Sequence, residues 1–249
     1  MLFHTNYPVA LWATALLLGV ALLSPPPPAW GTGFSVSPPR IEISPGQRIV
    51  TLTVRNHSDR PIAFQAESQR WVQEADGRSG YHLSPELVVV PPRFEIAAQQ
   101  QQSLRVGLRT PHPEHQEHAY RVYVTELPVT REVAPGAGEV SVLARFGIAV
   151  YIQPQSGKGD ADIQVTTAQR SGDHLTLQLE NRGARRGTIR EIILLAGEQP
   201  LTTHPGNWHL LAGAAFPITL EEEPAVLRRS SHLQLRDSDD NLSPRYPLD

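Results

Sequence analysis

The sequence lacks cysteine entirely, and it is almost free of lysine. None of its 249 residues is Cys, which excludes disulfide bonds, thiolate catalysis and cysteine-bound zinc. Lys158 is the only lysine, so the basic side chains are almost all arginine. The net charge of −3 is not typical of a protein that binds nucleic acid or an anionic membrane. A chain of this composition must be stabilised by packed apolar cores.

Charged side chains are also missing from residues 1–31, which contain no Asp, Glu, Lys or Arg. The apolar run at residues 9–23 is shorter than the roughly 20 residues of a bilayer-spanning helix, and prolines 25–28 follow it. This pattern predicts a signal peptide over residues 1–31, with Ala29, Trp30 and Gly31 as a small-x-small cleavage site. We therefore expect an exported protein; an uncleaved N-terminal anchor is the alternative.

Long amphipathic helices are absent as well, because no later segment shows a sustained 3.6-residue apolar repeat. Short segments of alternating apolar and polar residues occur instead, separated by turn residues. This pattern predicts an all-β protein composed of sandwiches. We expect strands near residues 49–55, 62–72, 87–90, 103–108, 120–126 and 140–152.

A polar, glycine-containing stretch at residues 155–160 predicts a linker between two domains. We expect residues 32–154 to form the first domain and residues 161–249 a smaller second sandwich. The strand pattern restarts after the linker. Strands are expected near residues 162–167, 174–180, 188–195, 208–211, 215–220 and 227–235.

An ordered set of segments in the first domain resembles the periplasmic pilus (fimbrial) assembly chaperone family. It comprises residues 34–40 (Phe-Ser-Val-Ser-Pro-Pro-Arg), 52–56, 89–96 (Val-Val-Pro-Pro-Arg-Phe-Glu-Ile), 120–128 and 152–154. The resemblance implies two immunoglobulin-like domains arranged at an angle. It also implies that a strand of the chaperone completes a subunit that lacks its last strand, in a PapD-like manner. In the family an arginine and a lysine hold the C-terminal carboxylate of that subunit.

The resemblance can be carried over to single residues. Arg40 matches the carboxylate-binding arginine, whose guanidinium can donate two parallel hydrogen bonds; an ordinary arginine at a strand edge is the alternative. The position of the lysine is taken by Ala149. Of a family ion-pair network between the domains, Glu117 matches one acid and Asp237 the second, while Gln153 stands in place of an arginine. These matches predict a client site that keeps the arginine of the usual carboxylate-binding pair and lacks its lysine.

Residues 140–152 predict the longest strand of the protein. Val140, Val142, Ala144 and Phe146 share one face of it, because side chains alternate along a strand. One interpretation is that this face only packs the core of its own domain. The other is that its first residues extend beyond the sheet and fill pockets in a client, which would explain an apolar edge strand that most proteins avoid.

The remaining motifs give little indication of chemistry. His112, His115 and His118 could bind a transition metal if they converged, but Pro111 and Pro113 favour an ordinary loop. The sequence contains no nucleophile elbow, zinc-protease motif or phosphate-binding loop, so we expect no enzyme, cofactor or metal.

The predicted function is that of a periplasmic chaperone for pilus-like subunits. We expect it to bind a subunit polypeptide and an outer-membrane assembly platform, and neither nucleic acid nor a small-molecule substrate. A metal-handling module that uses the loop of residues 112–118 is one alternative. A structural envelope protein that keeps the fold without capping a client is another.

Overall fold

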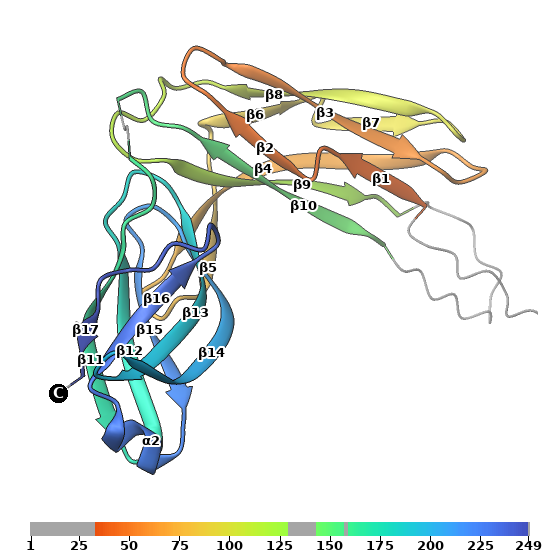
Figure 1. Cartoon of the computed structure of the whole chain (residues 1–249). Coiled ribbons are helices and arrows are strands. Elements are labelled where there is room, and N and C mark those ends of the chain that lie inside the picture. Colours follow the sequence, from red (N-terminus) through yellow and green to blue (C-terminus); the bar gives the residue numbers. More distant parts are fainter. Residues whose placement is uncertain (1–32, 129–142, 157–158, 249) are drawn as a thin grey trace, which may run out of the picture. The chain divides into compact units, whose positions relative to one another are not determined.

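Two β-sandwiches follow one another along the chain (Figure 1). The computed structural model describes residues 33–128, 143–156 and 159–248, and from Phe34 onward these residues belong to one compact unit. The predicted signal peptide, Val140 and Val142 lie outside the described residues. The predicted all-β fold with two sandwich-like domains is confirmed. No helix in the described part of the chain is both long and apolar enough to cross a membrane.

The first sandwich consists of two sheets. One has the strand order β1-β3-β8-β6; the other has the order β2-β10-β9-β4-β5, with β7 also paired to β4. The strands are β1 (Phe34–Ser37), β2 (Arg40–Ile43), β3 (Ile49–Asn56), β4 (Ile62–Gln73), β5 (Ser79–Leu83), β6 (Leu87–Val90), β7 (Arg93–Ile96), β8 (Gln101–Leu108), β9 (His118–Glu126) and β10 (Arg145–Ile152).

The core of this sandwich follows from the period-two alternation of its strands. In β8, for example, Leu104, Val106 and Leu108 are buried while the residues between them are more exposed. Leu104 packs in one cluster with Phe64 of β4 and with apolar residues of both sheets. Each such buried side chain contributes about 1.5–3 kcal/mol relative to an exposed one.

The N-terminal segment of the first sandwich changes sheets. β1 pairs antiparallel with β3 in one sheet, whereas β2 pairs parallel with β10 in the other. Pro38 and Pro39 lie between the two strands. They interrupt the ladder because proline has no backbone N–H to donate. β2 therefore begins abruptly, at Arg40.

The second sandwich pairs a sheet of order β11-β12-β15 with one of order β14-β13-β16-β17. Its elements are β11 (Ile163–Ser171), β12 (His174–Asn181), β13 (Gly187–Ala196), β14 (Gln199–Leu210), β15 (Ala215–Glu221), α2 (Pro224–Arg229), β16 (His232–Asp237) and β17 (Tyr246–Pro247). Its separate core includes Leu177, Leu179, Ile192 and Leu233.

Each sandwich also buries one asparagine that organises the loops around it. The Asn56 side-chain amide donates to the carbonyls of Arg60, Ile96 and Ala97 at 2.7, 3.0 and 3.1 Å. Asn181 donates in the same way to three carbonyls of the second sandwich. Both side chains are fully buried, and their hydrogen bonds offset the cost of that burial.

The structure differs from the sequence prediction at several elements. Five short strands, β1, β2, β5, β7 and β17, were not expected from the sequence. Residues 227–235, expected as a strand, contain the end of α2 and the start of β16. Pro224 lies in the first turn of α2, where proline favours a helix, and six residues are too short to show a helical repeat. β14 is longer than the expected strand at residues 208–211. β10 begins only at Arg145, and the prediction that it is the longest strand is wrong: it has 8 residues, whereas β4 and β14 have 12 each.

Candidate functional site

The edge of β10 is open over half of its length. β10 pairs with β9 through all eight of its residues (Figure 1). On its other side β2 pairs only with residues 149–152, beginning with Arg40 opposite Ala149. Within the described residues no strand pairs with residues 145–148 on that side. The first half of this strand therefore has a neighbour on one side only.

The backbone groups at this open edge can be assigned from the pairing with β9. The Glu126 N–H donates to the Ala144 carbonyl at 2.9 Å. Because paired residues of antiparallel strands alternate between bonded and non-bonded positions, the even-numbered residues of β10 bond to β9. The N–H and C=O groups of Arg145 and Gly147 therefore point to the open side. The backbone N–H of Gln153, which is also odd-numbered, donates to the Ile43 carbonyl of β2 at 2.9 Å, on the side that faces away from β9. Such an edge is a template for another strand.

Apolar side chains lie next to this edge. The Phe146 ring lies edge-on to Phe34 with centroids 5.0 Å apart, and Ala144 packs against the same core. Both residues are only half-buried, and Leu143 just before them is exposed. Of the four predicted client-binding positions in this segment, Ala144 and Phe146 thus present apolar surface beside the open edge.

Arg40 lies where the open edge ends. It is the first residue of β2, stands in register with Ala149, and its side chain is 63% exposed. Its nearest acid is Glu42, at 3.5 Å from Nε to Oε1. Ala149 is half-buried and packs against a cluster that includes Trp71 and Tyr151. The structure therefore brings Arg40 directly opposite the position where the family lysine is missing.

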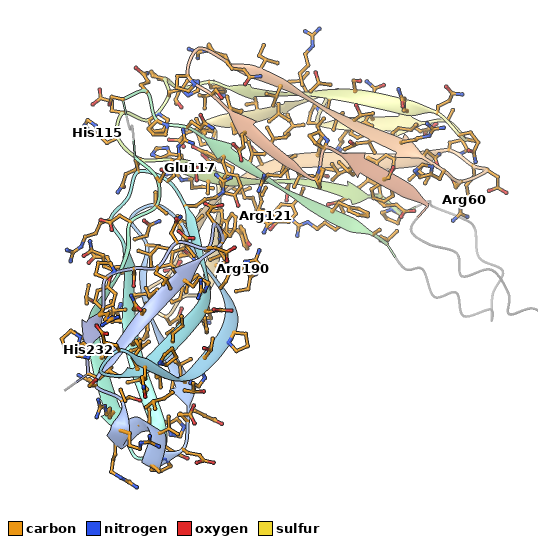
Figure 2. All side chains as sticks on the ribbon, viewed as in Figure 1. Arg60, His115, Glu117, Arg121, Arg190 and His232 are labelled. Atoms are coloured by element: carbon orange, nitrogen blue, oxygen red, sulfur yellow. The ribbon has the colours of Figure 1, made fainter. Side chains whose placement is uncertain are left out.

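Arg121 of β9 was not predicted from the sequence. It stands opposite Ala149 in the β9–β10 register, and its Nη1 donates to the Gly147 carbonyl at 3.0 Å. Its guanidinium also lies over the Trp71 ring, 4.7 Å from the centroid. Figure 2 shows this side chain on the sheet that carries β9. The alternation of β9 indicates its face, but only the pairing of β9 with β10 places it at the edge.

A third arginine on this face, Arg145, is already engaged. Its Nη2 lies 2.9 Å from Oε1 of Glu67, and its guanidinium stacks over the Tyr123 ring at 3.7 Å. Arg40, Arg121 and Arg145 give this face of the sheet a positive charge. We refer to the three together as the arginine face.

Glu117, predicted as part of an ion-pair network, is paired with Arg186. The Glu117 side chain is 2% exposed, and its Oε2 lies 2.5 Å from Nη1 of Arg186. The other guanidinium nitrogen of Arg186 lies 2.6 Å from Glu42, and the group stacks on the Tyr151 ring at 3.5 Å. Burial acts to raise the pKa of Glu42, but the hydrogen bond and charge of Arg186, with Arg40, outweigh it and lower that pKa. Arg186 was missed because nothing in its sequence context distinguishes it from Arg185.

Of the two other positions predicted for this network, Gln153 joins it through Glu42 and Asp237 does not. Gln153 donates from its side chain to Glu42 at 3.3 Å. The carboxylate of Asp237 accepts from the backbone N–H groups of Asp239 and Asn241, at 2.8 and 2.9 Å, and so closes its own turn. The structure does not bring Asp237 together with Glu117.

The three histidines considered as a metal site do not converge. The ring nitrogens of His112 lie 3.0 and 2.8 Å from the backbone carbonyls of Gln153 and Gln47. Nδ1 of His118 is 2.7 Å from the guanidinium of Arg70. His115 is exposed next to Glu114. Over the described residues no group of three or more His, Cys, Asp or Glu side chains could hold a metal ion.

The chain matches one family model and is similar to several solved structures. The family model of the pili and flagellar-assembly chaperones, PapD N-terminal domain, matches residues 33–158. One similar solved structure is the CsuC–CsuE chaperone–tip adhesion subunit pre-assembly complex from archaic chaperone-usher Csu pili of Acinetobacter baumannii. It is 18% identical, with 85% of this chain and 97% of that chain covered and a TM-score of 0.63.

Two further structures show the same fold. The class 5 fimbriae chaperone CfaA is 15% identical, with 86% and 100% of the two chains covered and a TM-score of 0.63. The Salmonella enterica chaperone SafB, solved with the SafA pilin, is 19% identical, with 88% and 98% covered and a TM-score of 0.53. No curated protein sequence matches the chain significantly.

Proposed function

Because this chain belongs to the pili and flagellar-assembly chaperone family, we propose that it is exported to the periplasm and caps pilus-type subunits that lack a strand. The open edge of β10 is the observation that carries this proposal. A subunit with an incomplete sheet pairs with this edge, and the chaperone thereby lends it a strand. The activity is binding rather than catalysis, and it uses no cofactor.

The edge can supply both affinity and selectivity. Arg145 and Gly147 offer two N–H and two C=O groups, and each hydrogen bond made there contributes about 0.5–1.5 kcal/mol net. Ala144 and Phe146 add apolar contact beside these bonds, because they are only half-buried in the chaperone itself. Val140 and Val142 belong to the same proposed surface by the alternation of the sequence. Extended pairing with alternate side chains in pockets is a recurring mode of peptide recognition.

The direction of β2 supports a role for Arg40. β2 is parallel to β10 and begins at Arg40, just where the open edge ends. A client strand that continues the line of β2 and runs in the same direction therefore ends in front of Arg40. If that strand is the last of its subunit, its C-terminal carboxylate meets the guanidinium, which binds carboxylates with two parallel hydrogen bonds.

The partners follow from this role. The client is a pilus-type subunit, and an outer-membrane assembly platform receives it from the chaperone. The structures of CsuC with a tip adhesion subunit and of SafB with a pilin are of such chaperone–subunit complexes.

Co-purification tests this function. The tagged protein is purified from periplasm in which candidate subunits are co-expressed, and the captured subunit is quantified by mass spectrometry. Arg145→Pro removes the N–H that points to the open side, whereas Arg145→Ala is the matched control that keeps it. We expect Arg145→Pro to lose the subunit and Arg145→Ala to keep it.

The same experiment separates the proposal from its alternatives. If the wild-type protein captures no subunit from any co-expressed set, it does not act as a capping chaperone, and a structural envelope role becomes the better explanation. If Arg145→Pro captures as much subunit as Arg145→Ala, the client does not bind through the edge of β10.

A further inference from the structure

Three residues form a row across the arginine face at the end of the open edge. Arg40 of β2 stands opposite Ala149 of β10, and Ala149 stands opposite Arg121 of β9. Directly opposed residues of neighbouring strands project to the same face of a sheet. Because strands lie about 4.8 Å apart, the backbones of Arg40 and Arg121 are separated by roughly 10 Å. Two arginine side chains at this spacing can approach one small anion from its two sides, above the short side chain of Ala149.

The acids of this face leave Arg121 available for such an anion. Glu67 is bound by Arg145 at 2.9 Å, and Glu42 is bound by Arg186 at 2.6 Å. In the described part of the chain no carboxylate lies within ion-pair distance of Arg121. Arg40 has only the longer contact of 3.5 Å to Glu42, a group that Arg186 already holds.

Arg121 is also linked to the open edge itself. Its Nη1 donates to the carbonyl of Gly147, a group that points to the open side. The Arg121 side chain crosses β10 at Gly147, which has no side chain to block it. A Cβ at that position would lie 3.7 Å from Cδ of Arg121 and 3.0 Å from the Tyr123 ring. A client strand that pairs with β10 brings its own N–H to this carbonyl and competes with Arg121 for it.

We infer that Arg121 is the second cation of the carboxylate site and takes the place of the lysine that is missing at Ala149. In the free protein its guanidinium is held on the Gly147 carbonyl. When a client strand pairs with the edge, its amide takes over that carbonyl, and the terminal carboxylate of the same strand is bound between Arg121 and Arg40. Strand pairing and carboxylate binding are thereby coupled. This inference rests on the proposed function and names a residue of the same site.

The test compares a carboxylate with an amide. The probe is a synthetic peptide with the C-terminal strand of the subunit that co-purifies, prepared as the free acid and as the C-terminal amide. Its Kd is measured by calorimetry for the wild type, Arg121→Gln, Arg78→Gln and the double variant Arg121→Gln/Ala149→Lys. Arg78→Gln is the control, because it removes an exposed arginine that pairs with Asp76 outside the client-binding edge.

We expect the wild type to bind the acid roughly tenfold or more tightly than the amide, since hydrogen bonds between charged groups are the strong ones. Arg121→Gln should lose most of this preference, Arg78→Gln should keep it, and the added lysine should restore it in the double variant. Arg121→Gln should still bind the amide peptide as the wild type does, which shows that the variant is folded.

The opposite results are equally informative. If Arg121→Gln keeps the full preference for the acid, or if Arg78→Gln loses as much of it, Arg121 is not the second cation. That result leaves the capping function intact, because the wild type still binds the peptide. If the wild type captures no subunit at all, the proposed function fails, and this inference fails with it.

Discussion

The buried pair of Glu117 and Arg186 gives the sharpest prediction about stability. Glu117 is 2% exposed and Arg186 is 16% exposed, and the two are joined by a 2.5 Å contact. Removing one partner of such a pair typically costs 3–5 kcal/mol, because the other charge is left buried and uncompensated. Replacing both partners with uncharged side chains of similar size often costs little.

The two single substitutions should lower the free energy of unfolding by different amounts. Arg186 keeps a second carboxylate, Glu42, when Glu117 is replaced by Gln. We therefore expect Glu117→Gln to lower the free energy of unfolding by about 1–3 kcal/mol. Arg186→Met leaves Glu117 without its counter-ion and should cost about 3–5 kcal/mol. The double variant should cost less than the sum of the two by about 1–3 kcal/mol, the coupling of residues in direct contact.

Equilibrium urea unfolding followed by tryptophan fluorescence measures these differences, and calorimetry shows whether both sandwiches unfold in one transition. Arg78→Ala is the matched control, because its pair with Asp76 is 84% and 51% exposed, and exposed pairs contribute about 0–1 kcal/mol. If Arg186→Met costs no more than Arg78→Ala, or if the two single effects simply add, the buried pair does not hold this part of the structure together.

Two further predictions concern stability. Burial and the charge of Arg70 lower the pKa of His118 below its usual 6.5, so the unfolded chain takes up a proton that the folded protein resists. Stability is then complete above about pH 6.5 and falls as the pH drops, by at most about 1.4 kcal/mol per pH unit. His118→Gln should flatten this slope in urea unfolding between about pH 7 and pH 5, and an unchanged slope would refute the assignment. Asn56→Ala removes the side-chain hydrogen bonds to three carbonyls, of which that of Ala97 still accepts one from the Gln100 N–H, and should cost about 1–3 kcal/mol in the same assay. A cost near that of an exposed substitution, below about 0.5 kcal/mol, would contradict the role given to Asn56.

The sequence predicts those features that are periodic or local. Alternation of apolar residues located most strands and the faces that form the cores, because a strand repeats every two residues. It did not locate α2, because six residues from Pro224 to Arg229 are fewer than two helical turns and bury only Leu227. Patterns of this kind cannot identify an element that is too short to show its repeat twice.

The site depends on contacts between residues that are far apart in the chain, and this limits prediction from sequence. Arg40 and Ala149 are 109 positions apart, yet the parallel pairing of β2 with β10 places them side by side. The resemblance to a family pointed to both residues, but not to Arg121 or Arg186, whose roles arise from register and from a contact between distant loops. The open half of β10 likewise follows from where β2 begins, which only the sheet topology specifies.

Amide hydrogen exchange at single residues of β10 tests the central claim most directly. In the free protein the amides of Phe146 and Ile148 point to β9, whereas those of Arg145 and Gly147 point to the open side. In the complex with a captured subunit, NMR should show exchange at Arg145 and Gly147 slowed at least tenfold, with little change at Phe146 and Ile148. A stable complex in which the amides of Arg145 and Gly147 exchange as fast as in the free protein would contradict strand donation by this edge.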